Sequence, residues 1–64
     1  MDRELCRALE EAIRDESEAI RAYRRLQRML PDPQARRLVW MIRRDEMGHR
    51  RVLEDMLARY CRPR

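Results

Sequence analysis

Three side chains of the types that hold metal ions fall on the apolar sides of two predicted helices. Glu46 and His49 are three residues apart in the segment DEMGHRRVL, so they are neighbours on one helix face. Glu16 occupies the apolar stripe of the preceding helical segment. A carboxylate or an imidazole in such a stripe costs free energy unless a partner compensates for it. The pattern therefore indicates a cation or another charged partner at this place.

Two helices joined by a proline-containing turn are predicted to position these side chains. Residues 2–30 contain neither Gly nor Pro, and their apolar residues recur with helical period. Pro31 and Pro33 then bracket Asp32, which can cap a second helix beginning at Pro33. A turn this short makes the helices antiparallel. We expect a single domain over residues 1–64, with helix 1 at about 2–30, the turn at 31–33 and helix 2 at about 33–60.

A hairpin of two amphipathic helices cannot bury both of its apolar stripes, because one side always stays open. A chain of 64 residues also leaves much of its surface in water. Pairing with a second hairpin solves both problems. The sequence therefore predicts an all-α fold, an antiparallel two-helix hairpin that forms a homodimeric four-helix bundle. Apolar residues off the main stripe, such as Trp40 and Met47, would allow association into higher oligomers.

The composition argues against several classes of partner. The chain has 16 basic residues, all of them Arg, and 12 acidic ones. Because both signs alternate along the sequence, the net charge of +4 is not gathered into a tail or stripe, and we expect no nucleic-acid partner. No apolar run approaches a membrane span, and the acidic N-terminus does not resemble a secretory signal. We therefore expect no membrane partner and a cytoplasmic location.

The three ligand-type residues are expected at one height of the hairpin. Glu16, Glu46 and His49 each lie roughly 20 to 25 Å from the turn, near the middle of their helices. A two-fold axis through a dimer would therefore bring together four Glu and two His. Two divalent cations would balance the carboxylates, which would otherwise repel one another and take up protons. Since carboxylate and imidazole suit iron or manganese, the sequence predicts a dinuclear metal site shared by two subunits.

The segments DESEAIRAY and RRDEMGHRRVL resemble the di-iron carboxylate ferritin-like superfamily. In that superfamily, a Glu from one helix and a Glu-x-x-His from the next form half of a metal site. Ferritins and rubrerythrins supply both halves from one chain, whereas this chain is similar to the half-length encapsulated ferritins, whose hairpins pair. The resemblance implies a ferritin-like bundle in which Glu16, Glu46 and His49 bind iron. It also implies that Tyr23 sits beside the centre as a hydrogen-bonding or redox-active residue.

Other features of encapsulated ferritins are matched only in part. Asp15 and Glu18 match acidic positions through which metal ions enter in that family. Helical counting directs Glu18 away from the hairpin interface, so this role needs a further subunit contact. The resemblance implies an encapsulin shell as a partner, but we expect no targeting extension after YCRPR, which puts loading into such a shell in doubt. Ala22 also stands where the family tends to have an aromatic residue.

These observations predict an enzyme, a ferroxidase that oxidises Fe(II) with dioxygen or peroxide in iron storage or detoxification. A rubrerythrin-like peroxidase, or a small di-iron or di-manganese oxidase, is an alternative that would use the same ligands. The sequence shows no rubredoxin-type Cys motif. A non-enzymatic helical adaptor is the alternative from another class, and it would depend on the arginines rather than on the glutamates.

The two cysteines lie near opposite ends of the chain. Counted from the turn, Cys6 and Cys61 come level at the open end of the hairpin. A disulfide is feasible there, within one chain or between chains. Two free thiols in a reducing cytoplasm are the alternative, and both remain open at this point.

Overall fold

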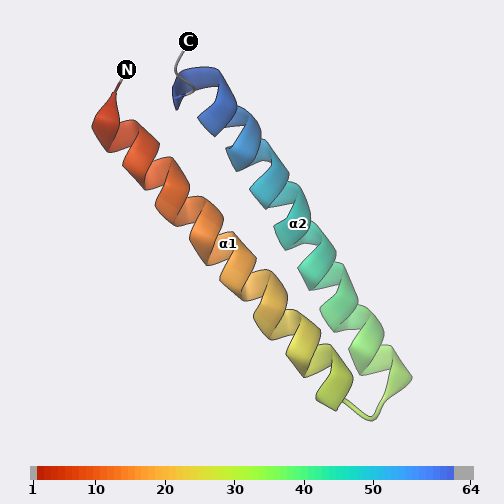
Figure 1. Cartoon of the computed structure of the whole chain (residues 1–64). Helices are drawn as coiled ribbons and strands as arrows, with labels where there is room; N and C mark the ends of the chain where they lie inside the picture. The colour runs from red at the N-terminus through yellow and green to blue at the C-terminus, as the bar shows by residue number, and fades with distance from the viewer. Residues whose placement is uncertain (1, 62–64) are drawn as a thin grey trace.

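The computed structural model describes residues 2–61, and they form a hairpin of two helices (Figure 1). Helix α1 spans Arg3–Met29 and helix α2 spans Pro33–Cys61. The helices run antiparallel side by side, with the turn at one end and both termini at the other. The rod measures 48 × 14 × 14 Å, and the described residues contain no strand. The predicted all-α helical hairpin is confirmed.

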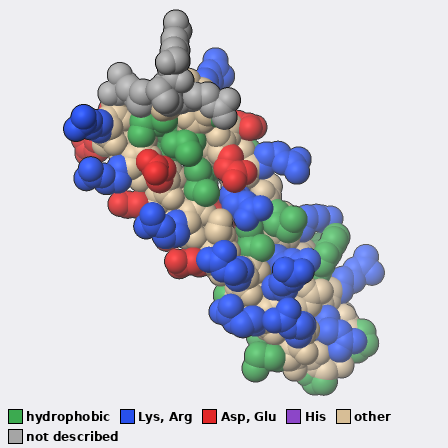
Figure 2. Space-filling model, viewed as in Figure 1, with side chains coloured by type: hydrophobic (Ala, Val, Ile, Leu, Met, Phe, Trp, Pro, Cys, Tyr) green, Lys and Arg blue, Asp and Glu red, His purple; other side chains and the backbone are tan. Residues whose placement is uncertain are grey.

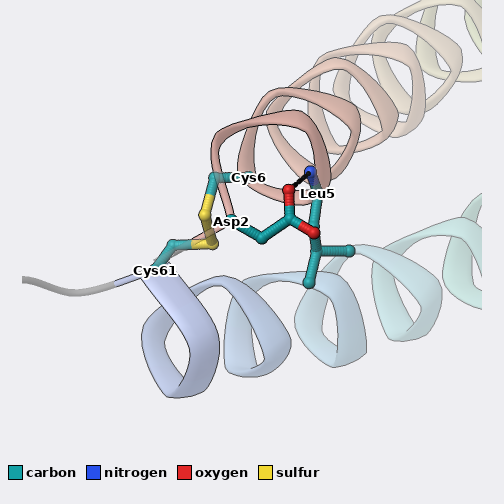
Figure 3. Close-up of a disulfide and its surroundings, with 4 residues drawn as sticks. All are labelled: Asp2, Leu5, Cys6 and Cys61. Carbon is teal, nitrogen blue, oxygen red and sulfur yellow. Dashed lines mark hydrogen bonds between the residues drawn. A yellow bond between two sulfur atoms is a disulfide. The ribbon is translucent and has the colours of Figure 1, made fainter.

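Side-chain caps fix where the helices begin. The Asp2 carboxylate accepts a hydrogen bond of 3.1 Å from the backbone N–H of Leu5 (Figure 3). Asp32 accepts an equivalent bond of 3.1 Å from the backbone N–H of Gln34. Each bond satisfies one of the amides that have no partner in the first turn of a helix. Asp32 therefore caps α2, as the Pro-Asp-Pro turn predicts.

An arginine closes the turn between the helices. Nη1 of Arg36 donates to the carbonyl oxygens of Leu30, at 2.9 Å, and Pro31, at 3.0 Å. The backbone N–H of Leu30 bonds to the carbonyl of Leu26 at 3.1 Å. The end of α1 is therefore tied to the first turn of α2. A turn held in this way sets the height of each residue of α1 relative to α2.

A disulfide closes the opposite end of the rod. Cys6 and Cys61 are bonded within one chain, with Cα atoms 5.7 Å apart and a sequence separation of 55 residues. Figure 3 shows the bond crossing from the first turns of α1 to the last turn of α2. Of the two states that the sequence left open, the structure therefore shows the intrachain disulfide. Both ends of the hairpin are fastened, so the helices cannot slide past each other.

The apolar core of the single hairpin is small. Among the described residues only Cys6, Leu9 and Val39 are buried. Many large apolar side chains remain exposed, and helical register gathers several of them on one side of the rod, beside the predicted metal ligands. We call this side the ligand face; its exposed apolar residues are Leu5, Leu26, Leu38, Ile42, Met56 and Tyr60.

Neither helix is long and apolar enough to cross a membrane within the described residues.

Candidate metal centre

The structure brings Glu16, Glu46 and His49 together near the middle of the rod. One ligand atom of each residue lies within 4.8 Å of the other two. Nδ1 of His49 is 3.3 Å from Oε1 of Glu46 and 3.7 Å from Oε2 of Glu16. Glu16 comes from α1, and the other two come from successive positions on one face of α2. The three residues that sequence spacing predicted to meet therefore do lie side by side.

The two carboxylates lie partly buried and close to each other. Each glutamate side chain is 22% exposed, and Oε2 of Glu16 is buried without a hydrogen-bond partner. Burial raises the pKa of Glu16, and the negative charge of Glu46 and a hydrogen bond with its side chain raise it further. A charged His49 acts in the opposite direction, while Asp15 adds a smaller increase to the pKa. The negative charge of the two carboxylates is therefore not balanced by the other groups of the cluster.

A divalent cation fits this arrangement. First-row metal ions lie about 2.0 to 2.2 Å from N and O ligands, so two ligands of one ion are at most about 4.4 Å apart. Small rotations of the side chains bring the observed separations, all within 4.8 Å, into that range. Two ionised carboxylates would balance a charge of +2, and Oε2 of Glu16 would gain the partner that it lacks. Oxygen donors with one imidazole suit iron or manganese.

Within residues 2–61, the cluster gathers three ligand residues from one chain, and the third is open to the outside. The His49 side chain is 62% exposed. It lies on the ligand face between Ile42 and Met56, each seven residues away and therefore on the same row of α2. Both of these apolar side chains are exposed as well. The cluster is therefore accessible from the side of the hairpin that has no apolar cover.

Three further residues predicted for the site lie outside the cluster. Tyr23 is half-buried on α1, about 10 Å along the helix from Glu16. No described hydrogen bond joins its hydroxyl to the cluster. Asp15 and Glu18 are exposed, and neither supplies an atom to the cluster. Their suggested roles, beside the centre and in metal entry, remain predictions.

One contact beside the cluster was not predicted. Nη1 of Arg50 on α2 donates to Oγ of Ser17 on α1, at 3.5 Å. Each of these residues directly follows a clustered residue in sequence. Their place in the sequence could have identified them. Residues that directly follow two side chains at the same height of the hairpin lie at nearly the same height themselves. The bond joins the two helices where the ligand atoms must stay aligned.

The raised pKa of Glu16 predicts how the stability of the metal-free chain varies with pH. A carboxyl whose pKa rises on folding stabilises the folded state at low pH. This contribution is complete below the ordinary value of 4.5 and is lost as pH rises through the higher pKa of the folded state. We therefore expect Glu16→Gln to raise the melting temperature at pH 7 and to flatten the pH dependence above 4.5.

Thermal melts followed by circular dichroism, in the presence of a chelator, measure this effect. Glu18→Gln serves as the matched control because it removes the same charge from α1 outside the cluster. We expect its melting curves to keep the wild-type slope against pH. If Glu16→Gln kept that slope as well, Glu16 would not be the source of the pH dependence.

Comparison with protein families identifies the family of this chain. A family model described as Rubrerythrin matches residues 1–61, which include both helices and the three clustered residues. The comparison with curated proteins and the comparison with solved structures gave no match.

Proposed function

This chain belongs to the rubrerythrin family of ferritin-like di-iron proteins, and we propose on this premise that two copies of it form a ferroxidase. In this proposal the copies pair through their ligand faces into a four-helix bundle. Each copy contributes Glu16, Glu46 and His49 to a centre that binds two iron ions. The observation that carries the proposal is the clustering of these three residues, with Oε2 of Glu16 buried and unpaired.

Pairing of two copies completes both the coordination and the charge balance. A two-fold axis near the middle of the rod would oppose the two clusters and provide four carboxylates and two imidazoles. Four ionised carboxylates balance two divalent cations. The same contact would cover the exposed apolar side chains of the ligand face, which a single hairpin leaves in water. Apolar burial and metal binding therefore favour the same dimer.

The residues of the site have distinct tasks in iron oxidation. Fe(II) is the substrate in this proposal, and each ion gives one electron to dioxygen or peroxide. The raised pKa of Glu16 favours its protonated form, and this proton must leave before the carboxylate can bind iron. Iron binding should therefore tighten as pH rises. His49 binds as the neutral imidazole. Ile42 and Met56 flank His49 and would exclude water once the second copy covers them.

Several finer points of the sequence interpretation belong to this proposal. Tyr23 would act beside the centre as a hydrogen-bonding or redox-active residue, and Asp15 and Glu18 would guide entering ions. Manganese would occupy the same donors. Larger assemblies would use the exposed Trp40 and Met47. The protein would act in the cytoplasm or within an encapsulin compartment.

Two other functions make different predictions. A peroxidase or small oxidase would turn over repeatedly with an electron donor, without accumulating ferric iron. A helical adaptor would leave added iron unoxidised, because it would depend on the arginines and not on the glutamates. Neither alternative has an observation in its favour as specific as the carboxylate and imidazole cluster.

Aerobic addition of Fe(II) to chelator-stripped protein tests the proposed function. We expect near-ultraviolet absorbance of ferric iron to rise much faster than in buffer, together with oxygen consumption. Saturation should occur at about one iron per chain before any slower phase. No acceleration over buffer, with either dioxygen or peroxide as the oxidant, would contradict a ferroxidase function.

A further inference from the structure

Arginines from both helices line a groove on the side of the hairpin away from the ligand face. Two adjoining hollows, of about 410 and 320 Å³, share Arg24 and Arg43 in their walls. Neither hollow is lined by Glu16, Glu46 or His49. We call this feature the arginine groove; its basic residues are Arg21, Arg24, Arg28, Arg36, Arg43 and Arg50.

The positive charge of the arginine groove has no counterpart in its walls. No Asp or Glu lines either hollow. Within residues 2–61, no arginine forms an ion pair with a carboxylate within 4.0 Å. Figure 2 shows basic side chains crowded over the half of the rod near the turn, whereas the acidic side chains of this view lie in the other half. Among the described residues, none of the six guanidinium groups is therefore paired with a carboxylate.

This concentration of charge differs from what the sequence suggested. Arg and acidic residues alternate along the chain, and the sequence was interpreted as having no basic stripe. That interpretation was wrong for the folded chain, because the hairpin places residues 21–28 opposite residues 36–50. These two segments contribute three groove arginines each. The basic surface is therefore created by the pairing of the helices.

Two of the groove arginines are held in place by the protein. Arg36 donates to the carbonyl oxygens of the turn, and Arg50 donates to Ser17. Each bond uses Nη1 and leaves the other donors of the guanidinium free. Positioned arginines bind phosphate oxygens in pairs of parallel hydrogen bonds and lose little conformational entropy in doing so. The groove thus combines uncompensated charge with partly fixed donors.

We infer that the arginine groove binds inorganic polyphosphate. Its basic residues extend over about 10 Å of α1 and about 21 Å of α2, which accommodates several phosphate groups in a row. The two arginine rows would bind a narrow chain from both sides. No aromatic ring lines the hollows, so the groove lacks the stacking platform that single-stranded nucleic acids use. A chain of phosphates without bases fits this surface best.

This inference does not depend on the metal centre. The groove lies on the side that the proposed dimer leaves open, so binding should occur with and without metal. Isothermal titration of the full-length chain with polyphosphate at low salt should show saturable binding and a raised melting temperature. We expect the affinity to fall at least about tenfold between 50 and 200 mM salt, since the contacts are ionic.

Charge-matched double variants provide the decisive comparison. Arg24→Gln with Arg43→Gln should weaken polyphosphate binding at least about tenfold, because both residues line both hollows. Arg7→Gln with Arg51→Gln removes the same charge outside the groove and should change the affinity less than about threefold. Glutamine keeps helix propensity close to that of arginine. Arg21→Gln with Arg28→Gln is the second groove variant if the first one does not fold.

Three results would overturn the inference. Equal weakening by the groove and control variants would indicate attraction to net charge alone. Tighter binding of duplex DNA than of polyphosphate, at equal phosphate concentration, would assign the surface to nucleic acid. Equal affinities for orthophosphate and for polyphosphate would indicate that the groove binds single anions and not a chain of phosphates.

Discussion

Glu46→Ala and His49→Ala are each expected to lower the initial rate of Fe(II) oxidation by at least about 100-fold. In the proposed dimer, each substitution would remove two ligands from the shared centre, one from each copy. Glu46→Ala would also leave the two proposed iron ions with two carboxylates, which carry too little negative charge to balance +4. The measurement is the initial rise of ferric absorbance after aerobic addition of Fe(II) to chelator-stripped protein.

Loss of the fold should not accompany this loss of rate. Glu46 is a source of the electrostatic strain at the site, since its charge raises the pKa of Glu16. We therefore expect the metal-free Glu46→Ala variant to melt no lower than the wild type. Glu54→Ala is the matched variant, because it removes an exposed carboxylate from the same helix outside the cluster, and it should oxidise iron at the wild-type rate. Wild-type rates in Glu46→Ala and His49→Ala would refute the metal centre.

Removal of the Cys6–Cys61 bond is expected to destabilise the metal-free hairpin by about 4 kcal/mol. The estimate follows from the length of the loop that the bond closes in the unfolded chain, since the two cysteines are separated by 55 positions in sequence. So few side chains are buried in the described part that the bond should carry a large share of the stability. The melting temperature should fall by roughly 15 °C or more. Denaturation of Cys6→Ser/Cys61→Ser and of the wild type, at one protein concentration, measures the change.

Reducing agent separates the disulfide from other effects of the two substitutions. Dithiothreitol should lower the midpoint of the wild type towards that of the double variant and leave the double variant unchanged. Because Cys6 lies about 15 Å along α1 from Glu16, the folded double variant should still oxidise iron. An unchanged wild-type midpoint after complete reduction would show that the bond contributes nothing measurable.

The hairpin and the cluster could be predicted because local rules determine both. Periodic apolar residues without Gly or Pro specify the helices, and Pro31, Asp32 and Pro33 specify a turn too short for any other arrangement. Once the turn is fixed, the rise per residue sets which side chains are level. That arithmetic is sufficient to bring Glu16 to the height of Glu46 and His49.

Other features depend on information that spacing does not contain. Counting brought Cys6 and Cys61 level, but whether thiols join also depends on the redox conditions. The arginine groove arises only when two segments lie side by side, so alternation of charge along the chain concealed it. The proposed cover of the ligand face would come from a second copy, and one chain shows only the apolar side chains that remain exposed.

Native mass spectrometry with metal analysis tests most directly that each chain carries half of a centre. We expect chelator-stripped protein to shift towards even-numbered assemblies when Fe(II) is added without oxygen, with one ion per chain. Glu46→Ala should fail to make this shift. Iron bound stoichiometrically by single chains, or pairs that assemble equally well in the wild type and Glu46→Ala without taking up iron, would contradict a shared centre.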